Sequence, residues 1–185
     1  MTLRWLRLPA MVILTVTLAA TSVQSQQREA QIRRALSAAP AAVAAHATVA
    51  VHSKRGEWIV LRHGDNGWTC IPASNGDPDP LPACFDANGL AFVEAFSAGR
   101  PPDPSKPGYS YMLQGGSAWS NLDPFADKLP KGAQDYIHIP PHIMILDAKI
   151  ANESGLPLKE PHPDTHRPFV MFGGTKYAIL IIPVQ

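Results

Sequence analysis

The sequence has no strong excess of either charge, and this lack excludes some classes of partner. Its 185 residues contain 16 Lys+Arg and 15 Asp+Glu, for a formal net charge of +1 at pH 7. It has no basic run longer than the pairs Arg33-Arg34 and Lys54-Arg55. Nucleic acids and anionic membranes are bound by clustered Lys and Arg. The composition therefore predicts no nucleic-acid partner.

The sequence also lacks the common catalytic and nucleotide-binding motifs. It has no G-x-S-x-G, no phosphate-binding loop, no dinucleotide fingerprint and no C-x-x-C. Ser117 and Ser120 lie near Asp123, but any chain of this length offers such a set by chance. Asp77 and Asp79 are interpreted as solvated turn residues. A serine hydrolase is therefore the least favoured class of function.

The first 25 residues have the order of a secretory signal peptide. Arg4 and Arg7 precede an apolar segment over residues 8–20, and a small-residue exit at residues 23–25 leads into polar residues. The apolar segment is shorter than the roughly 20 residues that span a bilayer. We therefore predict a cleaved leader over residues 1–25, a single domain over residues 26–185, and an extracytoplasmic protein (periplasmic or secreted) with no permanent membrane span. The lack of cysteine near the exit argues against a lipid anchor.

The sequence contains two cysteines, Cys70 and Cys84. Two cysteines in an exported chain most simply form one disulfide. The bond would close a loop of about 15 residues and contribute on the order of 3 kcal/mol. A two-cysteine metal site or a reactive thiol is the alternative.

Helical spacing and capping residues predict two main helices. Ile32, Leu36 and Ala39 recur at helical spacing in residues 26–39. Asp86 can cap a second helix that ends near residue 98. A short helix over residues 147–153 is also expected.

Alternating and apolar segments predict the strands. Residues 46–52, 57–63 and 68–71 should form three short antiparallel strands, with a hairpin at residues 64–67. Residues 109–113, 169–172 and 177–184 should form further strands. The fold class predicted is therefore α+β: one domain, with an antiparallel sheet of about 5–6 strands and two or three helices on one face.

Several short segments between residues 67 and 184 resemble the corresponding segments of a known group of proteins. They are residues 67–72, 82–86, 111–116, 141–144, 169–178 and 182–184. On these segments the chain resembles an uncharacterised family of small exported bacterial proteins. The resemblance implies a bacterial, extracytoplasmic setting and implies no activity, cofactor or fold.

The segment around His142 is the most site-like part of the sequence. In an extended chain His142 and Met144 share a face and would offer a nitrogen and a thioether, a pair that suits copper. His138 would join them if the two intervening prolines preserved the strand period, and Met112 and Met171 could complete a soft site. The alternative is that Met144 lies in the core and His142 is a hydrogen-bonded histidine.

Two further clusters are candidates for ligand binding. His162 and His166 lie four residues apart and could contribute to a zinc site, although the surrounding prolines favour a solvated loop. Trp119, Tyr111 and Asn121 could belong to a ligand groove, although aromatic side chains also fill cores.

These observations favour a non-enzymatic binding or interaction module whose partner is a small molecule or a protein. Its candidate surface comprises residues 114–123 and 140–144. The alternative is a periplasmic metal-binding protein or metalloenzyme that uses copper or zinc.

Overall fold

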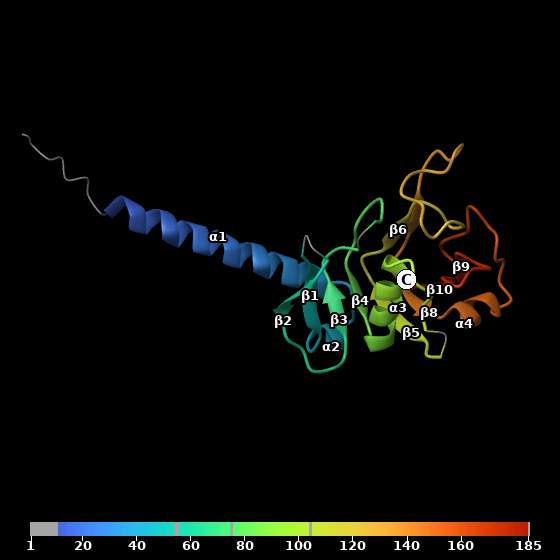
Figure 1. Ribbon diagram of the computed structural model, residues 1–185, viewed down its shortest axis with the longest axis horizontal. Helices are drawn as coiled ribbons and strands as arrows, with labels where there is room; N and C mark the ends of the chain where they lie inside the picture. Colours follow the sequence, from blue (N-terminus) through green and yellow to red (C-terminus); the bar gives the residue numbers. More distant parts are fainter. Residues whose placement is uncertain (1–10, 54–55, 75, 104, 185) are drawn as a thin grey trace, which may run out of the picture.

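The computed structural model describes residues 11–53, 56–74, 76–103 and 105–184, and for residues 11–22 it describes the backbone alone (Figure 1). In these residues the chain folds as one mixed sheet covered by helices, so the predicted α+β class is confirmed. The helices are α1 (Met11–Leu36), α2 (Ala41–Ala44), α3 (Ala87–Ser97) and α4 (Ala148–Asn152).

The described residues form a main sheet of eight strands in the order β2-β1-β3-β4-β5-β8-β10-β9. Neighbouring strands are antiparallel except β1 and β3, which are parallel. A second sheet pairs β6 with β7. In chain order the strands are β1 (Thr48–His52), β2 (Trp58–Arg62), β3 (Thr69–Ile71), β4 (Ala83–Phe85), β5 (Gly108–Met112), β6 (Gly116–Ala118), β7 (Ile137–Ile139), β8 (His142–Leu146), β9 (Phe169–Met171) and β10 (Ile179–Pro183).

One face of the main sheet is packed with small side chains against α1, and we call it the closed face. Its cluster contains both cysteines, which are fully buried and form the predicted disulfide. Farther along the same face, α4 packs on Val170, Ala178 and Leu180. The buried members of this cluster, from α1, the chain that follows it and the sheet, are Ile32, Ala35, Ala38, Ala39, Ala47, Val49, Cys70 and Cys84.

The opposite face lies beneath α3, and we call it the hollow face because a cavity, described below, lies there. Side chains alternate between the two faces along each strand, so Ile71 lies on the hollow face next to Cys70 on the closed one. The larger members of this face are Phe85, Phe92, Met112, Leu146, Phe169, Met171, Phe172, Ile179 and Ile181.

The first turn of α3 sits directly on the sheet. The Asp86 carboxylate caps the helix by accepting a hydrogen bond of 2.7 Å from the backbone N–H of Gly89, and it also accepts one of 2.9 Å from Tyr109 of β5. A Cβ on Gly108 would lie 2.4 Å from the Gly89 Cα. Only glycine at these two positions permits this approach, so the start of α3 is pinned to β5.

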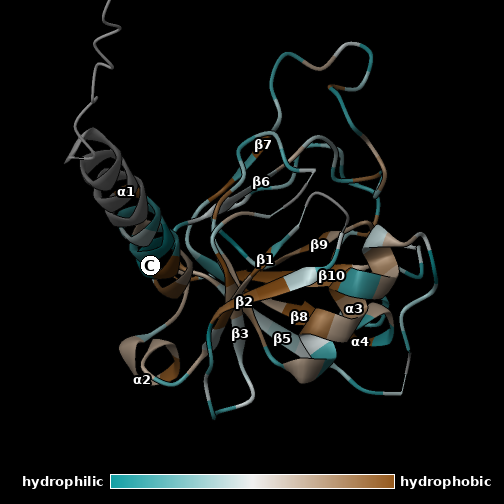
Figure 2. Cartoon of the chain, turned by 60° about the vertical axis from the view of Figure 1, so that its left-hand side comes forward, coloured by the Kyte–Doolittle hydropathy of each residue, from teal (hydrophilic) through white to brown (hydrophobic). Residues whose placement is uncertain are grey.

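Helix α1 is longer than the predicted helix over residues 26–39, because it starts at Met11. Most of the described side chains of α1 are hydrophilic, and the helix becomes apolar where it reaches the sheet (Figure 2). Arg28 donates to the Leu61 carbonyl, and Arg34 donates at 2.8 Å to both Pro72 and Pro80. Contact with the domain therefore begins just after the predicted cleavage point.

The predicted leader falls partly outside the described residues, since nothing is described for residues 1–10 and no side chain for residues 11–22. The leader over residues 1–25 therefore stays a prediction. Within the described part of the chain, no helix combines the length and the apolar character needed to cross a membrane.

The hairpin predicted at residues 64–67 is wrong. β2 and β3 are not neighbours, because β1 lies between them and pairs in parallel with β3. The chain crosses the end of β1 at Gly64, where an added Cβ would lie 2.3 Å from the backbone of Ala47. Thr48 then donates its backbone N–H to the Trp68 carbonyl at 2.8 Å. The glycine thus permits a close crossing of two backbones rather than a tight turn.

The main sheet is larger than the 5–6 strands expected, and the helices cover both of its faces rather than one. One of the extra strands is β4, which has three residues and follows a proline-rich segment, where alternation is too brief to be recognised.

Candidate functional site

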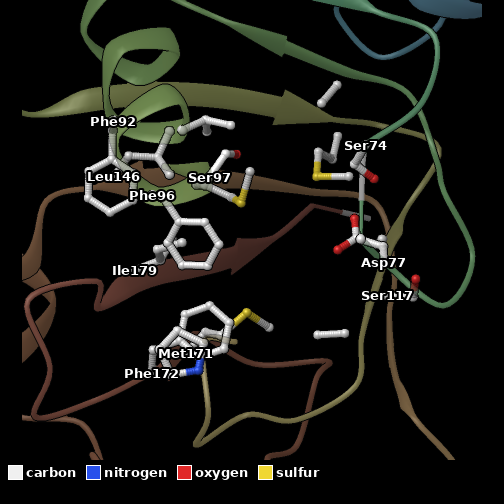
Figure 3. A pocket seen from close by; sticks show the side chains of 18 of the residues that line it. Ser74, Asp77, Phe92, Phe96, Ser97, Ser117, Leu146, Met171, Phe172 and Ile179 are labelled. Atoms are coloured by element: carbon white, nitrogen blue, oxygen red, sulfur yellow. The ribbon is translucent and has the colours of Figure 1, made fainter. Parts of the chain in front are cut away.

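A cavity of about 370 Å³ lies between α3 and the hollow face, and Figure 3 shows part of its lining. The pinned first turn of α3 closes one side. Farther along the helix, the rings of Phe92 and Phe96 stand between the helix and the sheet. The main apolar lining is Phe85, Phe92, Phe96, Met171, Phe172 and Ile179.

The other end of the cavity is polar and is held by three structural hydrogen bonds. Ser74, Asp77 and Ser117 gather there, away from the aromatic rings (Figure 3). The Ser117 hydroxyl donates to the Asp79 carbonyl and accepts from the Asp79 N–H, both at 2.9 Å. Trp119 donates its indole N–H to the Gly76 carbonyl at 3.0 Å. These contacts fix the disulfide-closed loop against β6 and so position Asp77.

Asp77 is a titratable residue in the lining of this polar end. Burial raises the pKa of Asp77 to about 6, and the neighbouring Ser74 hydroxyl opposes the rise. Within the described residues Asp77 has no ion-pair partner. At neutral pH the site therefore holds an unpaired carboxylate beside an apolar wall.

His142 lies in the wall of the same cavity and is completely buried. Its Nδ1 lies 2.7 Å from the Pro140 carbonyl oxygen, which can only accept, so Nδ1 carries the proton. Its Nε2 is buried without a hydrogen-bond partner. Burial lowers the pKa of His142 to about 4, so at neutral pH the ring is neutral with a bare acceptor at Nε2.

Three thioether side chains line the same cavity as this histidine. Met112 lies directly opposite His142 in the β5–β8 pairing, and Met144 and Met171 line the same cavity. A Cβ on Gly116 would lie 3.0 Å from His142 Cε1 and 3.4 Å from Met112 Cε. Glycine at position 116 therefore makes room for the imidazole ring and the thioether.

The other histidines of the predicted metal site lie elsewhere. His138 is exposed on β7, with its Nε2 3.1 Å from the Asp135 carboxylate. His162 and His166 lie in an exposed loop, and His166 faces Asp164 at 3.8 Å. Among the residues that the structure describes, no three His, Cys, Asp or Glu side chains come together to hold a metal ion.

The three residues of the predicted ligand groove are also separated. Trp119 lines the cavity. Tyr111 points to the closed face and packs on Trp68 with ring centroids 5.1 Å apart. Asn121 is buried and donates to the carbonyls of Glu160 at 2.7 Å and Val170 at 3.1 Å, so its amide joins loops together.

Sequence reasoning missed the phenylalanine residues that shape the cavity and did not place Asp77 in its lining. Phe96 stacks on Phe172 and Phe125, and Tyr177 meets Phe96 edge-on. Phe172 has a positive φ of 58°, a conformation that costs energy for a bulky residue and recurs at ligand sites. The helical spacing of Phe92 and Phe96 signals burial but does not say that the burial is incomplete.

One hydroxyl group at the polar end of the cavity is already engaged in hydrogen bonds. Ser117 is not a free nucleophile, because its hydroxyl both donates to and accepts from Asp79. Comparison of the chain with protein-family models, curated proteins and solved structures finds no match. The chemistry of the cavity is therefore the guide to function.

Proposed function

We propose that this protein is an extracytoplasmic binding protein that takes a small, mostly apolar organic molecule into the cavity between α3 and the hollow face. The observation that carries the proposal is the cavity itself, about 370 Å³ with a mostly apolar wall. Pockets for small molecules measure roughly 300–1,000 Å³ and combine apolar walls with few polar groups. Scaled by volume from a cavity that holds benzene, this cavity accommodates a ligand of on the order of 15 non-hydrogen atoms.

The extracytoplasmic setting rests on two features of the chain. The charge, apolar and small-residue order of the first 25 residues is typical of a leader. The buried disulfide suits an oxidising compartment.

Titration with the neutral dye N-phenyl-1-naphthylamine tests the binding function. We expect one saturable site with a rise in dye fluorescence. Ala118 lines the cavity and Ala41 is exposed on α2, so Ala118→Leu fills the site and Ala41→Leu is its matched control. Ala118→Leu should weaken binding at least about tenfold, the equivalent of 1.4 kcal/mol. An absence of saturable binding, or equal binding by the two variants, would contradict the proposal.

A second candidate function is favoured by the surroundings of His142. A buried, unpartnered imidazole nitrogen and the thioethers of Met112, Met144 and Met171 lie in the same wall. Imidazole and thioether ligands together suit copper(I). Zinc is less well supported, since the described residues bring no three of its usual ligands together.

Competition with the copper(I) chelator bathocuproine disulfonate tests this candidate. The full chain should withdraw copper(I) from the chelator, and Met112→Leu should withdraw less. His162→Ala is the control, since that histidine lies in an exposed loop. Failure of the unaltered chain to compete would remove the copper function and leave the organic ligand.

A further inference from the structure

The charged side chains that line the cavity are all acidic. Asp77, Asp123 and Asp127 belong to the lining, and no Lys or Arg among the described residues does. The whole chain is close to charge balance, with 16 Lys+Arg and 15 Asp+Glu. The negative character is therefore a property of the cavity and not of the protein as a whole.

The two indole N–H donors of the lining are occupied, whereas two of its acceptors are open to a ligand. The indole N–H of Trp119 is donated to Gly76 at 3.0 Å and that of Trp58 to Glu94 at 2.7 Å. The Asp77 carboxylate has no ion pair with a described residue, and the fully buried Nε2 of His142 has no partner. A ligand that satisfies this site must bring hydrogen-bond donors.

Asp77 is placed to receive such a donor. Figure 3 shows its carboxyl group directed toward the cavity, with the apolar side chains of Phe96 and Ile179 across from it. A carboxylate that is partly removed from water is stabilised by an opposite charge that desolvates with it. The cavity thus offers one charged end and one apolar end.

From this arrangement we infer, on the basis of the proposed binding function, that the natural ligand is a protonated amine with an apolar body. Its ammonium group binds the Asp77 carboxylate, and its hydrocarbon part packs among Phe96, Phe172 and Ile179. The unpartnered acceptor of His142 in the same wall is an independent sign that a donor-bearing ligand belongs there.

Three probes that share a phenyl ring and differ in charge test the inference. 2-Phenylethylamine, 2-phenylethanol and 3-phenylpropanoate are each used to displace N-phenyl-1-naphthylamine from the full chain. We expect the amine to bind at least about tenfold more tightly than the alcohol, because hydrogen bonds to charged groups are the stronger ones. The carboxylate should bind most weakly.

The variant Asp77→Asn tests whether the preference for the amine depends on the Asp77 carboxylate. The variant should lose the preference for the amine and keep its affinity for the alcohol, which also shows that the cavity is intact. Asp65→Asn is the matched control, because Asp65 is exposed and pairs with exposed His46 at 3.0 Å.

The possible failures are distinguishable. If neither the dye nor any probe binds, the proposed function fails. If the amine and the alcohol bind equally, the binding function stands and the inference is overturned. If Asp77→Asn keeps the preference for the amine, the assignment of Asp77 as its partner is overturned.

Discussion

The two faces of the sheet are packed in different ways. On the closed face, α1 contributes Ala35 and the following chain contributes Ala38, both fully buried, and these small side chains let the backbone approach the disulfide. On the hollow face, α3 touches the sheet at Gly89 but carries Phe92 and Phe96 in its later turns. Small residues therefore permit close packing on the closed face. On the hollow face, the first turn of α3 contacts the sheet and the rings of Phe92 and Phe96 hold its later turns away, which leaves a cavity.

The two faces of the sheet also differ in their buried titratable groups. The closed-face cluster is built from aliphatic residues and a disulfide, and none of its fully buried members titrates. The hollow face holds His142 and Asp77, whose pKa values burial shifts in opposite senses. Unpaired polar groups reduce the stability of a fold. This contrast is the basis for the proposal that the hollow face binds a ligand, whereas the closed face contributes stability.

Removal of the disulfide should give the largest effect on stability. In Cys70→Ser/Cys84→Ser, the cross-link between residues 14 apart is lost from the centre of the closed face. We expect the free energy of unfolding to fall by about 3–4 kcal/mol. Urea denaturation followed by circular dichroism measures the change.

Reduction of the unaltered chain is the control for this prediction. Dithiothreitol should lower its stability by a similar amount and should leave the double variant unchanged. A double variant as stable as the oxidised chain would mean that alanine packing alone holds the closed face.

The pH dependence of stability should depend on His142. Between pH 6.5 and 4 the unfolded state binds a proton that the folded imidazole does not, because burial lowers the pKa of His142 to about 4. Stability is therefore lost as pH falls through this window, by about 3 kcal/mol. In His142→Phe this loss should disappear. Denaturation midpoints at several pH values measure the slope, which a constant packing defect does not change.

The same enlargement should cost more stability on the closed face than on the hollow face. Ala35→Leu adds bulk where no space exists, and we expect a loss of about 2 kcal/mol. Ala118→Leu adds the same bulk beside the cavity and should cost less than about 1 kcal/mol. Thermal unfolding of both variants tests this difference. Equal losses would mean that the cavity wall is as tightly constrained as the closed face.

The fold was predictable where local chemistry determines it. The Asp86 cap predicted α3 correctly, and the short helix expected over residues 147–153 is α4, whose first turn is capped by the Asp147 side chain, which accepts from the Ile150 N–H at 2.9 Å. The parallel pairing of β3 with β1 was not predictable, because it depends on a crossing at Gly64 that looks like a turn in the sequence. Pairing between distant strands leaves no signal in either strand alone.

The candidate site was predictable only in part, for the same reason. The shared face of His142 and Met144 follows from the strand period, and both lie in the cavity wall. The approach of Met112 depends on the pairing of β5 with β8. Asp77 lies among prolines and looks solvated, and only the contacts of Ser117 and Trp119 with its loop bring it to the cavity.

Asp77 sharpens the comparison because its effect on the pH dependence of stability is opposite in sign to that of His142. Burial raises the pKa of Asp77 from 3.8 to about 6, so between these values the folded state holds a proton that the unfolded state releases. This contribution is present at low pH and is lost as pH rises through about 4–6. At pH 7, Asp77→Asn should therefore raise stability by about 1–2 kcal/mol, a value reduced for partial exposure to solvent.

The opposite slopes provide a test within one pH range. Between pH 6 and 4 the contributions of Asp77 and His142 offset each other in the unaltered chain, whose profile should be the flattest. Asp77→Asn should lose stability as pH falls, and His142→Phe should gain it. The exposed carboxyls of Asp103, Asp135 and Asp164 have lowered pKa values and contribute below this range. If both variants changed in the same direction, the two groups would not experience the opposed effects of burial that distinguish the hollow face.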